Sequence, residues 1–451
     1  MYAYPTTIQY NGIPVSNTNP FPIDLIHQIP TGSNTIGSVN VNVKNSNVSD
    51  LNPFPIKIAA PLTSKDYVKV SASEVKFFNT FQYGIETDVW DTYTSNGGTA
   101  LFSSNISGIP MIVNSQLNST VIRQTHNVMT YIPGRTTELT FGIRFTTPEA
   151  GIRRRIGLFN GSDGFYFEDN GGDYACVLIN SSSSNGIPYM ERISRADWNG
   201  DHLDGLGESK ITADPEAMQM ISFEYEWYGA GQIIFKYIIN GHPRIIHTFS
   251  TGNRLPFPWS KTPFLPIRLE ITNIAGIAGS HYLYQFSNSL ANLGISQKTG
   301  VSQSILTPLV GINMPNAKTF YPIISIRLKP TALQGVVIPT FFQTGTFDNT
   351  SVFYKLIRNT SITDGTWVDM TDPNSFTQYN ISSVLPISGG VDLETGIVAT
   401  GSSVRVALDK TTELQIGRSS LGTVSDTLTL AVAGFGANKD AVGSLTWIEQ
   451  R

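Results

Sequence analysis

Residues 233–249 read Ile-Ile-Phe-Lys-Tyr-Ile-Ile-Asn-Gly-His-Pro-Arg-Ile-Ile-His-Thr-Phe, two apolar runs on either side of Asn240-Gly241. Both runs are rich in β-branched and aromatic residues, which favour strands. Asn and Gly adopt the positive φ angles of a two-residue type I′ turn, and this turn matches the twist of the strands beside it. The stretch therefore predicts an antiparallel β-hairpin and sets the fold class expected around it.

Further strand patterns surround this hairpin. Residues 139–145 alternate apolar and polar side chains, and residues 155–159 and 165–168 flank a turn rich in Gly and Asp. Strand patterns that recur about every 8 to 12 residues are typical of a β-sandwich or barrel. We therefore expect one large antiparallel β-sandwich, of the jelly-roll or concanavalin-like kind, over residues 67–300.

A second set of strand patterns follows residue 300. Its clearest members are residues 323–328, 352–357, 404–408 and 427–432. Roughly 150 residues suit a smaller domain, and we predict a smaller C-terminal β-sandwich over residues 301–451. With an extended N-terminal arm over residues 1–66, the chain is expected to be all-β.

The composition fits this class and excludes several functions. Charged residues make up only 14% of the 451 residues, while there are 40 glycines and 25 prolines, a balance typical of strands joined by many turns. With a net charge of −4, we expect no nucleic-acid partner, and we interpret the basic run at residues 153–155 as an alternating strand face. Cys176 is the single cysteine, so no intrachain disulfide is possible. No apolar run approaches the ~18 residues of a membrane span.

A nine-residue phrase occurs twice near the N-terminus. Residues 15–23 (VSNTNPFPI) return 33 residues later as residues 48–56 (VSDLNPFPI), identical at seven of nine positions. Each proline fixes its own φ and keeps the preceding residue extended, so the Asn-Pro-Phe-Pro core cannot be helical. An extended peptide cannot bury its own phenylalanine, so we predict that each phrase docks into a groove on a partner protein. The predicted anchoring residues are Pro20, Phe21, Pro22, Ile23, Pro53, Phe54, Pro55 and Ile56.

Two groups of acidic residues are candidates for chemistry. Glu224 and Glu226 lie two apart in a strand pattern, and paired carboxylates perform acid–base chemistry in many glycan hydrolases. No second acidic element follows at a hydrolase-like spacing, so a hydrolase stays an alternative. The second group has the residue types of a calcium site but not the ligand spacing of an EF-hand, and we expect a solvated turn and no cofactor or metal. Its members are Asp163, Glu168, Asp169, Asn170 and Asp173.

The segment 196–205, Ala-Asp-Trp-Asn-Gly-Asp-His-Leu-Asp-Gly, is the candidate for sugar binding. An exposed tryptophan stacks on a sugar ring, and nearby amide and carboxylate groups bind its hydroxyls. The candidate glycan contacts are Trp198, Asn199, Asp201 and Asp204. The alternative, which the pattern favours, is an Asx-rich turn with the tryptophan packed beneath it.

Several segments within residues 130–272 resemble, in order and spacing, a family of tailed-bacteriophage virion proteins. They are RRRIGLF (153–159), DGFYFE (163–168), DWNGDHLDG (197–205), EYEWYGAGQI (224–233) and TPFLPIR (262–268). The resemblance implies a concanavalin-like sandwich and a structural role in the particle, without catalytic residues to transfer. The repeated phrase is likewise similar to the arms of phage particle proteins.

Together these features predict a non-enzymatic structural protein of a phage tail, baseplate or fibre, located in the virion after synthesis in the host cytoplasm. The first alternative is a capsid-decoration or minor capsid protein. The second is a carbohydrate-binding, lectin-like host-recognition module or a glycan depolymerase. The expected partners are other virion proteins, further copies of the chain in a trimer or other cyclic oligomer, and a host surface glycan.

Overall fold

The structure, a computed structural model, describes residues 73–182, 187–294, 299–408 and 414–450, together with the backbone of four short strands before them. The chain divides into two compact units, residues 1–59 and residues 60–451. The short strands of the first unit are β1 (Gln9–Tyr10), β2 (Ile13–Pro14), β3 (Asn42–Val43) and β4 (Ser46–Asn47). The eight predicted anchoring residues, in 20–23 and 53–56, lie outside the described residues.

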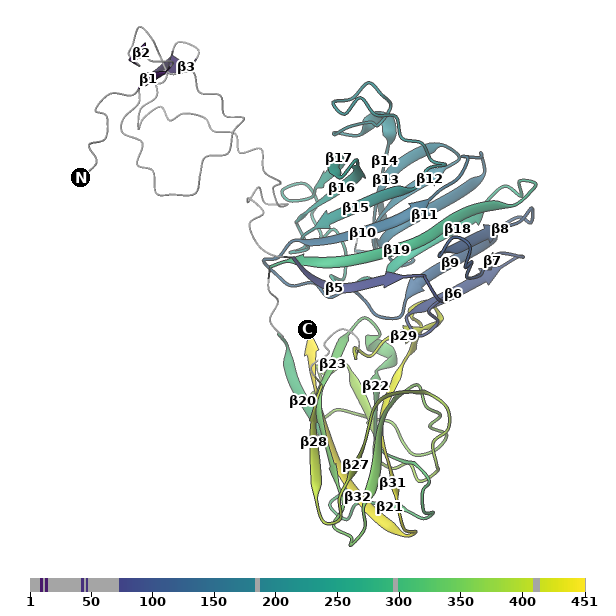
Figure 1. Cartoon of the computed structure of the whole chain (residues 1–451), viewed down its shortest axis with the longest axis vertical. Helices are drawn as coiled ribbons and strands as arrows, with labels where there is room; N and C mark the ends of the chain where they lie inside the picture. The colour runs from purple at the N-terminus through teal and green to yellow at the C-terminus, as the bar shows by residue number, and fades with distance from the viewer. Residues whose placement is uncertain are drawn as a thin grey trace. The chain divides into compact units, whose positions relative to one another are not determined.

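The first sandwich consists of two antiparallel sheets, and Figure 1 shows the strands of one sheet behind those of the other. The eight-stranded sheet has the order β17-β16-β15-β10-β19-β8-β7, and β5 also pairs with β19. Its strands are β5 (Ser73–Thr80), β7 (Thr99–Ala100), β8 (Ile109–Val113), β10 (Thr137–Arg144), β15 (Gln219–Tyr225), β16 (Gln232–Ile239), β17 (His242–Ser250) and β19 (His281–Leu293).

The second layer of this sandwich is a seven-stranded sheet with the order β14-β13-β12-β11-β18-β9-β6. Its strands are β6 (Trp90–Ser95), β9 (Ser119–Thr125), β11 (Ile152–Phe159), β12 (Gly164–Asn170), β13 (Asp173–Asn180), β14 (Tyr189–Ser194) and β18 (Ile267–Asn273). The core lies between the layers. In β10, for example, Leu139, Phe141 and Ile143 are buried while Glu138 and Thr140, at the intervening positions, are partly exposed, as the period of two in a strand requires.

The hairpin predicted over residues 233–249 is confirmed. It consists of β16 and β17, which pair antiparallel from Ile239 and His242 at the turn. Asn240 and Gly241 have φ angles of 52° and 77°, and these two positive values are those of a type I′ turn. The local signal was sufficient for the register next to the turn, whereas a bulge between Phe235 and Lys236 shifts the register farther along the pair.

Residues after 300 form a second pair of antiparallel sheets, with the orders β20-β32-β23-β28 and β25-β26-β22-β31-β24-β27, and β21 also pairs with β32. Its strands are β20 (Val301–Leu306), β21 (Ile312–Met314), β22 (Tyr321–Leu328), β23 (Val336–Gly345), β24 (Val352–Arg358), β25 (Val368–Asp369), β26 (Thr377–Asn380), β27 (Val391–Val398), β28 (Ser403–Ala407), β31 (Thr427–Gly434) and β32 (Lys439–Gln450). A separate pair is β29 (Arg418–Ser419) with β30 (Val424–Ser425).

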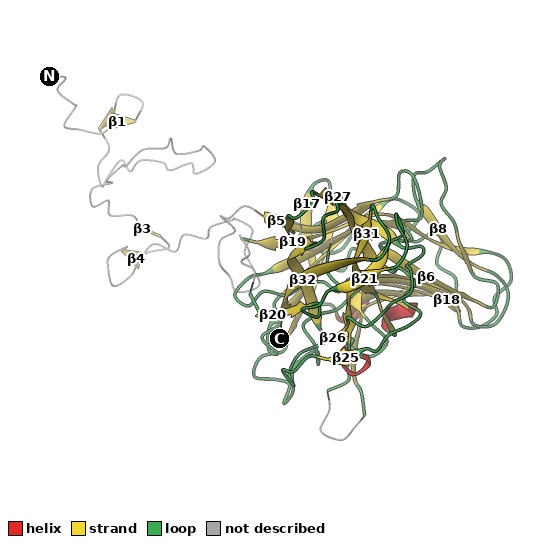
Figure 2. Ribbon diagram, turned by 90° about the horizontal axis from the view of Figure 1, so that it is seen from below, coloured by secondary structure: helices red, strands yellow, loops and turns green. Residues whose placement is uncertain are grey.

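The predicted all-β class is confirmed for the described part of the chain. Figure 2 shows strands and loops with only short helical segments, and these are the 3₁₀ turns η1 (Arg195–Asp197), η2 (Pro330–Ala332) and η3 (Ser420–Gly422). Among the described residues, no helix is long and apolar enough to cross a membrane. The domain limits at residues 66/67 and 300/301 stay predictions.

Candidate functional site

Trp198, the candidate for stacking on a sugar ring, is a core residue. Its side chain is 5% exposed, and its ring centroid lies 6.1 Å from that of Phe167. Its indole N–H donates to the carbonyl oxygen of Ile193 at 3.2 Å. Sugar stacking needs an exposed ring face. The buried ring of Trp198 instead agrees with the alternative interpretation, a tryptophan packed beneath a turn.

The polar neighbours of Trp198 bind backbone groups, Asn199 those of β17 and the two aspartates those of their own turn. The Asn199 amide donates to the carbonyl oxygen of Thr248 at 2.9 Å and accepts from its N–H at 2.8 Å. Asp201 and Asp204 accept from backbone N–H groups of the turn, and this hydrogen bonding lowers the pKa of Asp204. The cavity beneath Trp198 has a volume of about 10 Å³, room for one water molecule rather than a sugar.

The predicted carboxylate pair is buried. Glu224 has no exposed side-chain surface and forms an ion pair with Lys236. Glu226 is also buried and accepts a hydrogen bond from the hydroxyl of Thr136 at 2.8 Å. A polysaccharide cannot reach a carboxylate without exposed surface, so Glu224 and Glu226 do not form an open acid–base pair in this structure.

The acidic residues of the calcium candidate point in different directions. Asp169 faces the core, where its carboxylate binds Arg154 at 2.6 Å with both side chains fully buried, whereas Glu168, one position earlier, lies on the opposite face of β12. Asp163 accepts hydrogen bonds from the N–H groups of Ser181 and Lys261. In the part of the chain that the structure describes, no three His, Cys, Asp or Glu side chains gather as metal ligands.

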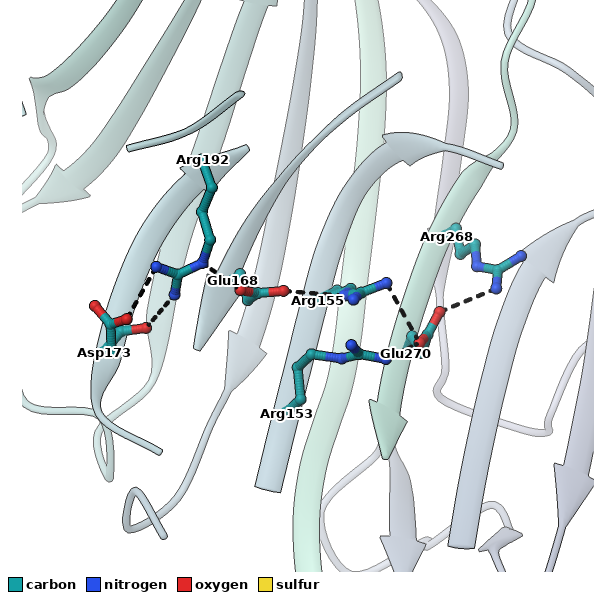
Figure 3. Close-up of polar contacts among 7 residues, drawn as sticks. All are labelled: Arg153, Arg155, Glu168, Asp173, Arg192, Arg268 and Glu270. Atoms are coloured by element: carbon teal, nitrogen blue, oxygen red, sulfur yellow. Dashed lines mark hydrogen bonds and ion pairs between the residues drawn. The ribbon is translucent and has the colours of Figure 1, made fainter. Parts of the chain in front are cut away.

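The outer face of the seven-stranded sheet carries a row of charged side chains, which we call the charged band (Figure 3). It extends across five neighbouring strands, β14, β13, β12, β11 and β18. Its members, in that order, are Arg192, Asp173, Glu168, Arg153, Arg155, Arg268 and Glu270. The band lies on a sheet face rather than in a loop, so regular strand geometry positions every member.

Strand alternation and register assemble the band. In β11 the side chains of Ile152, Arg154 and Ile156 are buried, so Arg153 and Arg155 lie on the outer face. The register places Arg155 opposite Glu168 on β12 and opposite Glu270 on β18. The central arginine therefore lies between two carboxylates, one on each neighbouring strand.

The arginines and carboxylates of the band alternate as ion pairs. Glu168 accepts from Nε of Arg155 at 3.1 Å and from Nε of Arg192 at 2.8 Å. Arg192 also contacts Asp173 at 2.9 Å. Glu270 accepts from Nη2 of Arg268 at 2.9 Å. Each contact restricts a long side chain, so the band presents its groups in fixed positions.

Two of the three carboxylates of the band are shielded by the arginines around them. The Glu168 and Glu270 side chains are only 6% and 8% exposed. Burial alone would raise the pKa of Glu270, but Arg268, Arg155 and Arg153 outweigh it, and the pKa lies below its usual value. Glu270 is therefore a poor proton donor at neutral pH and a strong hydrogen-bond acceptor.

Arg153 has donors that no group in the described part of the chain accepts. Its Nε–H has no acceptor there, and its Nη2 lies 3.6 Å from Oε1 of Glu270, beyond hydrogen-bond distance. Its side chain is 28% exposed. Burial and the positive charge of Arg155 lower the pKa of Arg153. Four arginines against three carboxylates leave the band with one net positive charge.

Two aromatic rings lie on the same face as the band. The guanidinium carbon of Arg155 lies 5.0 Å from the ring centroid of Tyr166, and that of Arg268 lies 5.4 Å from the ring centroid of Phe159. These rings lie 4.7 Å apart and pack with Ala175 in one small cluster. The cluster supports the arginines from below and limits their motion.

No protein-family profile matches the chain, and no curated protein matches it in sequence. Solved structures are similar to about half of it. A legume lectin-like domain from Entamoeba histolytica is 14% identical with a TM-score of 0.28, and the match covers 48% of this chain and 97% of that domain. Peanut lectin is 12% identical with a TM-score of 0.29, and the match covers 50% of this chain and 100% of the lectin. These similar structures are lectin-like β-sandwiches, whereas the resemblance to virion proteins stays a prediction.

One expectation from the sequence, that the chain is not an enzyme, is overturned by the solved structures. They include a family 16 glycosyl hydrolase protein from Mycobacterium smegmatis, 12% identical with a TM-score of 0.32 over 48% of this chain and 100% of that one. They also include a protein described as a β-glucanase from Mycobacterium abscessus, 11% identical with a TM-score of 0.33 over the same shares. The physical reason is that one sandwich supports binding or catalysis, depending on the residues of its site.

Proposed function

We propose that the chain binds carbohydrate through the charged band of its lectin-like sandwich. The observation that carries this proposal is the band itself, seven charged side chains held together on one sheet face. Removing charges from water costs free energy, and hydrophobic replacements of an ion-pair network are often as stable. Stability alone therefore gives little reason for such a band, whereas ligand binding does.

The chemistry of the band suits sugar hydroxyls. A guanidinium donates two parallel hydrogen bonds and a carboxylate accepts two, so both types bind neighbouring hydroxyls in defined directions. The ion pairs of Arg155 with Glu168 and of Arg268 with Glu270 hold these groups in place before a ligand arrives. Side chains that are already ordered lose little entropy on binding.

Calorimetry of the full chain against a panel of neutral and acidic polysaccharides tests this proposal. We expect binding to at least one polysaccharide, and at least about tenfold weaker binding by Arg155→Met, which removes the central charge. The control is Arg405→Met, an exposed arginine on β28 outside the band. Reducing ends measured in the same mixtures show whether a bound polysaccharide is also cleaved. Unchanged binding by Arg155→Met, or no binding to the panel, contradicts the proposal.

The duplicated phrase favours a second candidate function, that of a component of a phage particle. Two copies of an extended, proline-flanked phenylalanine on one chain suit docking to other particle proteins. In this proposal the partners are virion proteins, the location is the virion, and the sandwich recognises a glycan on the host surface. Incorporation of phrase variants into particles tests it.

A further inference from the structure

We infer that the ligand of the charged band is an acidic glycan, and that a carboxylate of the glycan binds between Arg153 and Arg155. The inference rests on the proposed function and adds the chemical class of the ligand. It assigns different tasks to the groups of the band. Arg153 and Arg155 bind the acid group, and the carboxylates of the band accept hydrogen bonds from hydroxyls.

The two arginines converge on one place. They lie two positions apart on β11, and side chains at that spacing stand about 7 Å apart on one face. Nη2 of Arg153 and Nη1 of Arg155 lie 3.6 and 3.7 Å from the same oxygen of Glu270. Both distances exceed a hydrogen bond. Glu270 therefore attracts both guanidinium groups electrostatically but accepts no hydrogen bond from these two nitrogen atoms.

An anion at this place would satisfy groups that the protein does not. The Nε–H of Arg153 is buried without an acceptor in the described residues, and a buried donor without a partner is costly. Two neighbouring guanidinium groups also repel each other. A negative oxygen beside the exposed part of Arg153 gives its guanidinium group an acceptor and adds to the screening that Glu270 already provides between the two arginines.

A single carboxylate suits the band better than a phosphorylated group. The band has one net positive charge, which one carboxylate neutralises, whereas a phosphate monoester carries nearly two charges. Glu168 and Glu270 lie on either side of Arg155 and would repel excess negative charge. Guanidinium groups also match the two oxygens of a carboxylate in one plane.

Calorimetry with three uronate polymers, each beside its carboxyl-reduced form, tests this inference. We expect the full chain to bind at least one acidic polymer about tenfold or more tightly than the reduced polymer. Arg153→Met should lose that preference, whereas Arg405→Met, which lies outside the band, should keep both the preference and the affinity for the reduced polymer. Because Arg153 is partly exposed and its Nε–H is unpaired, the variant should unfold at the same urea concentration as the wild type or a higher one.

The outcomes separate the two proposals. Equal affinity for acidic and reduced polymers, lost together in Arg155→Met, overturns the acidic ligand and leaves carbohydrate binding standing. Absence of binding to every polysaccharide overturns both. Binding of dextran sulfate as tight as that of the best uronate polymer overturns the carboxylate assignment, since it would show attraction to negative charge in general. Arg153→Lys distinguishes charge from geometry, because lysine keeps the charge but lacks the planar pair of donors.

Discussion

His247 shows how burial determines the protonation state of one residue beside the turn of Trp198. Its side chain is 6% exposed, and its Nδ1 accepts a hydrogen bond from the N–H of Asn199 at 3.3 Å. Burial lowers the pKa of His247 from 6.5 to about 4, against a smaller opposing effect of Glu191. The imidazole is therefore neutral at physiological pH, and the turn depends on that neutral form.

A pH dependence of stability follows from this shift. In the unfolded chain His247 takes up a proton near pH 6.5, but in the folded chain only near pH 4. Its contribution is thus fully present above pH 6.5 and is lost as the pH falls toward 4. Urea unfolding at pH 7.5 and pH 5 should show a larger loss for the wild type than for His247→Gln, whose side chain does not titrate. Equal losses in both proteins would contradict this assignment.

Among the elements, β11 and β12 carry the centre of the charged band. They pack closely at Gly157 because this residue has no side chain. A Cβ at Gly157 would lie 2.2 Å from the carbonyl oxygen of Phe165 and 2.9 Å from Cβ of Tyr166. Gly157 lies opposite Tyr166 in the register, so this close approach lets the tyrosine ring pack against β11 and support Arg155.

Gly157→Ala should therefore destabilise the protein by about 1–3 kcal/mol, the usual cost of overpacking, and should weaken polysaccharide binding. Gly161→Ala is the matched control, since a Cβ there meets nothing within 4 Å and it lies in the turn that joins the same two strands. Urea unfolding and calorimetry of both variants give the comparison. Equal stability of the two variants would show that β11 and β12 can separate without loss.

The elements also show which parts of the site the sequence predicts. The turn at residues 160–163 aligns β11 with β12, so Arg155 opposite Glu168 follows from local pattern, as does the alternation of residues 153–155. The pairing of β18 with β11 cannot be predicted in this way, because Glu270 on β18 is 115 residues from Arg155. The register of β18 depends on the packing of the whole sheet. Trp198 shows a similar division. The Asx-rich turn over a packed tryptophan is recognisable in sequence, but its packing partner Phe167 comes from β12, which local pattern does not indicate.

In the whole molecule, the proposed binding surface and the proposed anchors belong to different parts of the chain. The charged band is built from strands within residues 152–273, whereas the repeated phrases occupy residues 15–23 and 48–56. A weak sugar site becomes effective when many copies act together, because linked sites raise the effective concentration of ligand. A particle that displays many copies would supply this avidity, so the two candidate functions support each other.

The repeated phrases give the prediction that tests this combination. Burying one phenylalanine contributes about 1.5–3 kcal/mol, so two anchors on one chain should hold it far more tightly than one. Phe21→Ala and Phe54→Ala should each sharply reduce the amount of chain that sediments with particles purified from producing cells. Leu51→Thr is the control, because Thr18 occupies the equivalent position of the first phrase, and it should assemble normally. If either phenylalanine variant is incorporated as fully as Leu51→Thr, the phrases are not paired anchors. The proposed glycan binding would then lose the avidity argued from display on a particle.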